Sequence, residues 1–496
     1  MRTVKAALQV SLAHALLSLA LAAALTSAAI AAGGRVGTEV LLGVGILLAV
    51  FPWPGLNVLA AYPGRPASRG LGLPVHGDES RAMRAATVGT TILVLACVCV
   101  VLLDGAVWLR AVLVVAAVVI AGAATARLLR AFCTMRRQRA AQRRAILDFA
   151  PEIVLYTGRT EGGAYQIRQW LPLLQTVTPK VMVVVRHPTA IENLATELPG
   201  GIPIVCSREN KDLDQVMVPS VHTVFYVNSV TSNANLVSYR NVRHVYLGHG
   251  DSDKEISAHP AHRMYDVIFV AGQAAIDRYR AHKVWLDDGQ ARVIGRPQLD
   301  GVLPVSGTRS APRTVLYAPT WSGYNEASSL SSLAYAGPFI SDLTSRGIRV
   351  IFRPHPFSRT GGPDAGYVSA IDHLLAIDSG QHLLSEAAGA ASLVDLFNDS
   401  DAMVADISSL LVDYLATLKP IATLVRGPLP SRSLYPSIEH AYLPSSIAAE
   451  AWSQFLSSDP LRERRERAAA YYLGGTSAEM FRQAVLSLGS PTGPPT

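Results

Sequence analysis

The chain opens with long apolar runs and continues with short apolar stretches that alternate with amphipathic ones. Four apolar runs of about 20 residues or more cover roughly residues 6–32, 36–61, 85–103 and 106–126. Because about 20 apolar residues are enough to cross a bilayer as a helix, this pattern predicts an α-helical transmembrane region of about four spans within residues 1–130. For the first run a cleaved secretory signal is the alternative, since small residues lie near its end.

Positive charge predicts the orientation of these spans. The arginines that flank the runs are Arg65, Arg69, Arg81 and Arg84 in one loop, and Arg127, Arg130, Arg136, Arg137, Arg139, Arg143 and Arg144 after the last run. By the positive-inside rule, we expect a multi-pass protein of the cell membrane whose following domain faces the cytoplasm. Residues 131–150 are predicted to form a basic juxtamembrane linker that contacts membrane lipid, with a solvated helix face as the alternative.

From residue 151 onward, short apolar runs alternate with helical stretches, which is typical of a mostly parallel sheet with helices on both faces. The pattern restarts near residue 312, so we expect an α/β fold with two doubly wound, Rossmann-like domains at 151–300 and 312–455. Helices at 456–488 and a disordered tail at 489–496 complete the expected order. The expected strands are 152–156, 180–185, 202–206, 223–227, 242–247, 267–270, 292–294, 314–318, 349–352, 383–384, 402–405 and 420–424.

Composition narrows the classes of function. Half of the 496 residues are hydrophobic and only 16% are charged, and the apolar excess lies before about residue 130. The net charge of +7 is modest and sits largely in the arginine cluster, which favours a membrane surface over nucleic acid as a partner. The four cysteines show no repeated spacing and thus no disulfide framework. Histidines 244, 249, 259 and 262 lack the spacing of metal ligands, so no metal is predicted.

Two strand ends carry histidines beside cationic residues. His249 and Gly250 directly follow an expected strand, and Lys254 comes shortly after them. A histidine in that position suits general base catalysis, and the lysine suits a phosphate charge. Arg353 and His355 follow another strand and alternate with prolines, which fix the backbone. The simpler interpretation is a surface histidine and a solvated lysine.

A third strand end combines carboxylates and hydroxyls. Residues 402–405 suit a buried strand, and Asp406 and Ser408 are good N-cap residues for the helix that follows. The start of a helix with free backbone N–H groups and the hydroxyls of Ser408 and Ser409 suits a phosphate. Asp413 shares a helix face with Ser409 and suits a ribose hydroxyl. An ordinary capped helix is the alternative, but the three strand ends together suit transfer from a nucleotide-activated donor.

The ordered motifs resemble those of the CDP-glycerol glycerophosphotransferases, which build teichoic acid backbones. The resemblance covers roughly residues 240–425 and does not include the apolar runs. Gln298, Ala405 and Ile407 depart from the family pattern. The matching elements are HGxxxK at 249–254, GxPRxD at 295–300, YAPTW at 317–321, RxHP at 353–356 and the segment from Asp401 to Pro420 that contains TDYSS in the family.

The resemblance implies a GT-B-type fold and the attack of an acceptor hydroxyl on the phosphorus that bears the polyol, with CMP leaving. The implied donor is CDP-glycerol or a related CDP-polyol, and the acceptor is lipid-linked or polymeric, bound on the side of domain 151–300. No cofactor and no metal are implied. A sugar-nucleotide glycosyltransferase and a non-catalytic membrane scaffold of the same fold are the alternatives. The implied site residues are His249 and His355 for catalysis, Lys254, Arg353, Asp406, Ser408 and Ser409 for the donor phosphates, and Asp413, Pro319 and Thr320 for the nucleotide.

Overall fold

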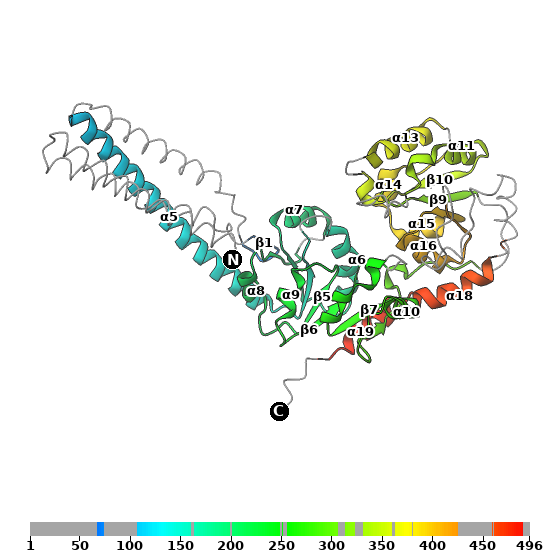
Figure 1. Ribbon diagram of the computed structural model, residues 1–496, viewed down its shortest axis with the longest axis horizontal. Coiled ribbons are helices and arrows are strands. Elements are labelled where there is room, and N and C mark those ends of the chain that lie inside the picture. The colour runs from blue at the N-terminus through cyan, green and yellow to red at the C-terminus, as the bar shows by residue number, and fades with distance from the viewer. Residues whose placement is uncertain are drawn as a thin grey trace. The chain divides into compact units, whose positions relative to one another are not determined.

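Figure 1 shows the helices and strands of the computed structural model. The chain divides into two compact units. One unit combines Met1–Pro151 with Val183–Val218, and the other combines Glu152–Met182 with Pro219–Thr496. This division runs through a strand rather than along the expected domain boundaries, which stay predictions. The described residues are 67–73, 107–159, 163–198, 201–248, 250, 255–305, 313–322, 331–359, 363–378, 380–424, 459 and 461–489.

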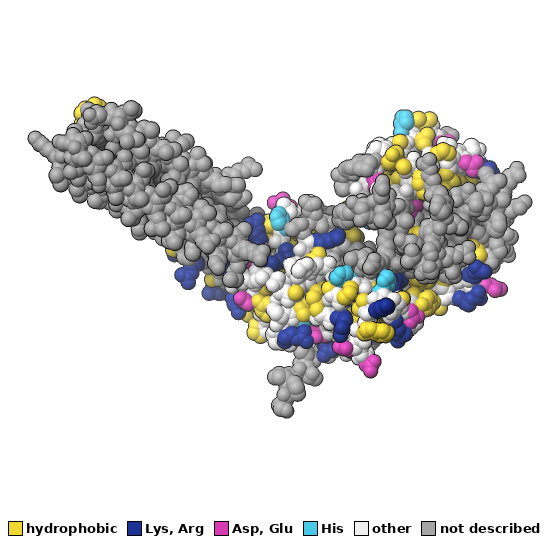
Figure 2. Space-filling view, viewed as in Figure 1, with side chains coloured by type: hydrophobic (Ala, Val, Ile, Leu, Met, Phe, Trp, Pro, Cys, Tyr) yellow, Lys and Arg dark blue, Asp and Glu magenta, His cyan; other side chains and the backbone are white. Residues whose placement is uncertain are grey.

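The first unit contains a long helix and short strands. Strand β1 pairs with β4 in antiparallel fashion, and β4 pairs with β3 in parallel. Helix α5 carries the arginine-rich stretch at its C-terminal end, where Figure 2 shows basic side chains in dark blue. Arg139 forms an ion pair with Asp212 of α8 at 3.1 Å, and Arg143 donates to the carbonyl of Asp214 at 2.6 Å. The elements are β1 (Ser68–Arg69), α5 (Val107–Phe149), β3 (Val181–Val185), α7 (Pro188–Glu197), β4 (Ile204–Cys206) and α8 (Asn210–Val216).

The predicted four-span transmembrane region is contradicted. Among the described residues, no helix is long and apolar enough to cross a membrane. The fourth run lies in helix α5, which continues without a break from Val107 through the arginines to Phe149. The first three runs, at 6–32, 36–61 and 85–103, fall on residues that the structure does not describe. The predicted multi-pass location and its cytoplasmic orientation depend on these spans, and the described residues do not support them.

The second unit contains a parallel sheet with the strand order β2-β5-β6-β7-β8. Every residue of β2, β5 and β7 is buried. Parallel strands that are covered on both faces need continuous apolar sequence, and this is why the apolar runs predicted them. The elements are β2 (Ile153–Thr157), α6 (Ala164–Gln175), β5 (Thr223–Tyr226), α9 (Asn233–Val237), β6 (Arg243–Tyr246), η1 (Glu255–Ala258), η2 (Pro260–Met264), β7 (Val267–Val270), α10 (Gln273–Ala281), β8 (Ala291–Val293) and η3 (Pro297–Leu299).

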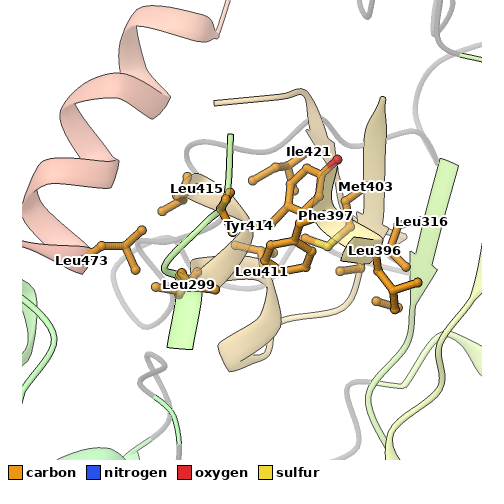
Figure 3. Close-up of a cluster of buried hydrophobic side chains, with 14 of the residues drawn as sticks. Leu299, Leu316, Leu396, Phe397, Met403, Leu411, Tyr414, Leu415, Ile421 and Leu473 are labelled. Atoms are coloured by element: carbon orange, nitrogen blue, oxygen red, sulfur yellow. The ribbon is translucent and has the colours of Figure 1, made fainter. Parts of the chain in front are cut away.

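The same unit contains a second parallel sheet with the order β10-β9-β11-β12. Alternate residues of its strands point into two separate cores. Leu316 and Met403 pack with residues of α15, α16 and α18 (Figure 3), whereas Tyr317 and Val404 pack with α11 and α13. The elements are β9 (Thr314–Ala318), η5 (Leu333–Tyr335), α11 (Gly337–Ser345), β10 (Arg349–Phe352), α12 (Pro356–Arg359), α13 (Pro363–Ile377), α14 (Ser385–Ala390), α15 (Leu393–Asp399), β11 (Ala402–Ala405), α16 (Ser409–Tyr414), η6 (Leu415–Thr417), β12 (Ile421–Ala422), α18 (Arg462–Leu473) and α19 (Ala478–Leu486).

The α/β part of the predicted fold is confirmed by these two sheets. The expected strand at 383–384 is reduced to a single bridge between Leu383 and Ile351. The last expected strand is short, since β12 holds only Ile421 and Ala422. The C-terminal helices are α18 and α19, and α18 packs against α10, α16 and η6.

Candidate active site

Polar residues gather at one edge of the second sheet. Strand β9 lies between β10 and β11, and all three run parallel, with Ala318 opposite Ala405. The carboxyl ends of these strands therefore meet at the same edge, which is where doubly wound sheets bind their ligands. The residues that follow these ends are Pro319 and Thr320 after β9, Arg353 and His355 after β10, and Asp406, Ser408 and Ser409 after β11.

Asp406 organises the loop that follows β9. Its side chain belongs to a residue only 1% exposed, and one carboxylate oxygen accepts the backbone N–H groups of Thr320 at 2.8 Å and Ser332 at 3.0 Å. The carbonyl of the buried Pro319 accepts the backbone N–H of His355 at 3.1 Å. An ionised carboxylate accepts hydrogen bonds but cannot donate them. Asp406 therefore suits loop positioning better than direct contact with a phosphate.

The helix start after β11 presents two hydroxyl side chains. Ser408 is the N-cap residue of α16, with an extended backbone at φ −156° and ψ 171°, and its side chain forms no capping bond. Its hydroxyl is buried and has no hydrogen-bond partner within the described part of the chain. The first N–H groups of a helix and an unused hydroxyl favour an anion, and the polar groups at Ser408 and Ser409 fit a phosphate.

Asp413 lies one turn into the same helix and has a partner that the sequence reasoning missed. The guanidinium of Arg296 donates from Nε to Asp413 Oδ1 at 2.8 Å and from Nη2 to Oδ2 at 3.0 Å. Both side chains are almost fully buried, at 6% and 4% exposure. The paired geometry holds the carboxylate in one orientation. Each carboxylate oxygen keeps a second acceptor site, so a ribose hydroxyl remains a feasible donor to Asp413.

Arg353 is tied to the end of a helix. Its Nη1 donates to the carbonyl of Ala388 and, at 3.3 Å, to the carbonyl of Ala391, at the C-terminal end of α14. Burial lowers the pKa of the guanidinium, and the positive charge of Arg168 lowers it further. An arginine keeps its charge in spite of such a shift. The guanidinium of Arg353 therefore partly binds the carbonyls at the end of α14. Arg168, in α6, is a second positive charge near it.

The ring of His355 has a defined tautomer. Its Nδ1 accepts the backbone N–H of Phe357 at 3.2 Å, so the neutral ring carries its proton on Nε2. The ring stacks near Trp321 at a centroid distance of 6.2 Å and meets the edge of Phe357 at 5.2 Å. His355 is thus fixed as a hydrogen-bond donor through Nε2, which suits contact with a phosphate oxygen.

The element that contains His249 and Lys254 is only partly described. The structure does not describe these two residues, but it places Gly248 and Gly250 on either side of His249. A Cβ atom on Gly250 would lie 2.9 Å from both Cβ and Oγ of Ser409. The backbone of the HG element therefore packs against the first residue of α16. Two of the three predicted strand ends meet at this contact.

Two further residues, Asp364 and Lys419, form hydrogen bonds near this edge. Asp364, at the start of α13, accepts the backbone N–H of Ser322 at 2.9 Å and the hydroxyl of Ser358 at 3.2 Å. Lys419 is 2% exposed and donates to three carbonyls, including that of Phe397 at 2.6 Å. Asp364 thus joins the loops after β9 and β10, and Lys419 holds the end of α15.

The buried histidines of the first sheet have partners inside the protein. His244 accepts or donates at Nδ1 with the hydroxyl of Tyr226 at 2.9 Å and bonds the carbonyl of Tyr239 through Nε2 at 2.9 Å. His262 bonds the hydroxyl of Tyr279 at 2.6 Å. Burial lowers the pKa of both imidazoles, to about 4 for His262. These rings are neutral parts of the core.

Open α/β sheets bind their ligands beyond the carboxyl ends of the strands, and the polar groups described above lie there. Residues 260–426 match the model of the CDP-glycerol:poly(glycerophosphate) glycerophosphotransferase family. The match confirms the family that the motifs resemble and the class of transferase that they predict. It includes Arg353, His355, Asp406 and the start of α16, whereas His249 precedes it.

Solved structures give weaker similarities. The wall teichoic acid polymerase TagF aligns with a TM-score of 0.45 and 14% identity, covering 71% of this chain and 93% of that one. A putative UDP-N-acetylglucosamine 2-epimerase from Listeria monocytogenes aligns with a TM-score of 0.43 and 12% identity, covering 68% and 95%. Alignments at this level support no argument on function. No curated protein sequence matches the chain.

Proposed function

We propose that this protein transfers glycerol phosphate from CDP-glycerol to a hydroxyl of a polymeric or lipid-linked acceptor and releases CMP. The reaction would be a step in the synthesis of a teichoic-acid-like polymer of the cell envelope. The observation that carries the proposal is the contact between Gly250 of the HG element and Ser409 of α16. Gly250 directly follows the candidate base in the sequence and Ser409 belongs to the candidate phosphate site, so the contact supports a transfer reaction, which needs both groups at one place.

The donor would bind at the edge formed by β9, β10 and β11. Its diphosphate would accept hydrogen bonds from the hydroxyls of Ser408 and Ser409 and from the free N–H groups at the start of α16. The Nε2–H of His355 would donate a hydrogen bond to a phosphate oxygen, and the guanidinium of Arg353 would neutralise part of the charge. Lys254 is proposed as a further cation. Asp413, held by Arg296, would accept a ribose hydroxyl, and Pro319 and Thr320 would border the nucleotide.

The chemical step would be a displacement at phosphorus. The acceptor hydroxyl attacks the phosphorus that bears the glycerol, and a new P–O bond forms. The bond from that phosphorus to the bridging oxygen breaks, and its electron pair leaves with CMP. His249 takes the proton of the attacking hydroxyl, as expected of a histidine at a strand end. The cationic and N–H groups stabilise the charge that grows on the phosphate oxygens.

The experiment that tests this function is a donor comparison with the full chain. We expect release of CMP from CDP-glycerol, and transfer of label from radioactive glycerol phosphate to a product that can be sized. CDP-ribitol would compete if the site accepts a longer polyol. Transfer from a UDP-sugar or CMP-sugar, without turnover of either CDP-polyol, would contradict the proposal and favour a glycosyltransferase. Binding of CDP-glycerol without CMP release would favour the non-catalytic alternative.

A further inference from the structure

The turn that leads into His249 is held by a side chain from another element. The indole Nε1–H of Trp170, in α6, donates to the carbonyl oxygen of Gly248 at 2.8 Å. The bond is buried, and Trp170 is only 2% exposed. Gly248 has a φ of +64°, a left-handed conformation that glycine adopts without strain. The hydrogen bond therefore acts on a backbone whose conformation is already unusual.

The other side of the same turn is fixed by the candidate phosphate site. The backbone of Gly250 packs so closely against Ser409 that a Cβ atom would lie 2.9 Å from its Oγ. The same Cβ position is 3.9 Å from Nη2 of Arg296, which binds Asp413. The segment between β6 and η1 is thus attached at Gly248 to the tryptophan and at Gly250 to α16.

Trp170 is itself supported by the C-terminal helix. Its ring lies 5.4 Å from the ring of Phe481 in α19, and Phe481 is fully buried. Phe481 also meets the edge of Phe269 in β7 at a centroid distance of 6.2 Å. The indole is therefore packed on a rigid background, and its N–H direction is fixed. Such support is what a group needs to hold another in place to within a fraction of an ångström.

A purely structural explanation of this bond is available, because buried indole N–H groups usually find an acceptor. It would predict a loss of stability on removal of the donor and no effect on the reaction. The position of the acceptor argues for more. Gly248 is the residue directly before the proposed base, and its carbonyl is fixed only two residues from the contact with Ser409. A shift of about 1 Å at a reacting group can cost a factor of about 100 in rate.

We propose that Trp170 is a positioning residue, which fixes the backbone at Gly248 and so keeps Gly250 in contact with the start of α16, where the donor phosphate is proposed to bind. This inference rests on the proposed function for its kinetic consequences, but the placement of the turn can be measured without activity. The residue belongs to α6 and lies outside the segment that matches the family model.

The test compares Trp170→Phe with Leu174→Val in the full chain. The first keeps an aromatic ring and removes the N–H donor. The second removes one methylene from a fully buried residue of the same helix, without touching the turn, and is the matched control for lost stability. With CDP-glycerol as donor, we expect Trp170→Phe to lower kcat by about 10- to 100-fold with KM changed less than about 2-fold. Leu174→Val should keep kcat within about 2-fold while lowering Tm by a similar few degrees.

Hydrogen exchange separates the inference from the proposed function. In Trp170→Phe, the amides of peptides that span residues 246–250 and 408–411 should exchange faster, and in Leu174→Val they should not. Equal exchange in the two variants, or equal kcat in an active protein, would overturn the positioning role. A wild-type protein that releases no CMP from CDP-glycerol would contradict the proposed function, and faster exchange in Trp170→Phe alone would still support the positioning of the turn.

Discussion

The buried histidines near the first sheet bond other side chains of the core, whereas Ser408, at the edge of the second sheet, has a buried hydroxyl that bonds none in the part of the chain that the structure describes. His244 and His262 bond tyrosine hydroxyls inside the core, at 2.9 and 2.6 Å, and both have a lowered pKa because of burial. At the edge of β9, β10 and β11, Ser408 has a buried hydroxyl without a partner among the described residues. Nε2 of His262 is also buried without a partner among the described residues. The two sites therefore differ in place: the histidine rings lie inside the core and bond tyrosines there, whereas the hydroxyl of Ser408 lies at a strand end, where a ligand can bind.

Breaking the ion pair below this edge should have the largest effect. Arg296→Met would leave the carboxylate of Asp413 buried without its partner, because both side chains are at most 6% exposed. We expect a loss of about 3–5 kcal/mol in the free energy of unfolding, measured by urea denaturation. The double variant Arg296→Met with Asp413→Leu should recover much of this stability and remain inactive. A single variant as stable as the wild type would show that the pair does not hold α16.

Crowding the junction of the two elements should come next. Gly250→Ala places a Cβ 2.9 Å from Ser409 and should push the HG turn away from α16. We expect kcat to fall by about 100-fold, which corresponds to about 2.7 kcal/mol. The control is Gly366→Ala in α13, where an added Cβ meets nothing within 4 Å, and CMP release should be unchanged. Equal rates in the two variants would remove the junction from the reaction.

The pH dependence of stability tests whether the buried ring of His262 is neutral. The pKa of His262 is lowered to about 4 in the folded protein because of burial, from an ordinary value near 6.5. The unfolded chain therefore binds the proton first as the pH falls, and stability is lost between about pH 6.5 and 4. We expect a loss of about 2 kcal/mol between pH 7 and pH 5 from this group. His262→Gln should remove that part of the slope, and an unchanged slope would contradict a neutral buried ring.

The smallest effect should come from the unused hydroxyl. Ser408→Ala should change the free energy of unfolding by less than about 0.5 kcal/mol, since the hydroxyl has no partner in the described part of the chain. It should raise KM for CDP-glycerol by about 10-fold through loss of a hydrogen bond to a charged phosphate. The control is Ser400→Ala, whose hydroxyl bonds Tyr414 at 2.9 Å. This variant should lose stability and keep KM, and the reverse pattern would make Ser408 structural.

The sequence predicts most strands of both sheets because they are buried apolar runs, as in β3 and β11. It also predicts the residues at the strand ends, since the motifs stand directly after those runs. It does not predict their partners. Arg296 and Asp413 are 117 positions apart, and Trp170 and Gly248 are 78 apart. Contacts of this kind depend on how the halves of the chain pack, which local patterns do not encode.

The transmembrane prediction rests on the lengths of the apolar runs, and the described residues do not support it. Hydropathy averaged over a window identifies the apolar run at 106–126, but it does not indicate how far the helix that contains the run extends. In the structure that helix continues to Phe149, and its arginines bind α8. The length of an apolar run indicates that a span is feasible, but it does not fix where the helix ends or what its polar end contacts.

The central claim is that the HG turn and the start of α16 form one site for a CDP-linked donor. The most direct measurement is CMP release from CDP-glycerol by the wild-type protein and by His249→Ala, together with the binding of CDP-glycerol to both. The account predicts a loss of about 100-fold or more in CMP release, with binding kept within about 3-fold because α16 and its neighbours hold the donor. Near-normal CMP release by His249→Ala would contradict it.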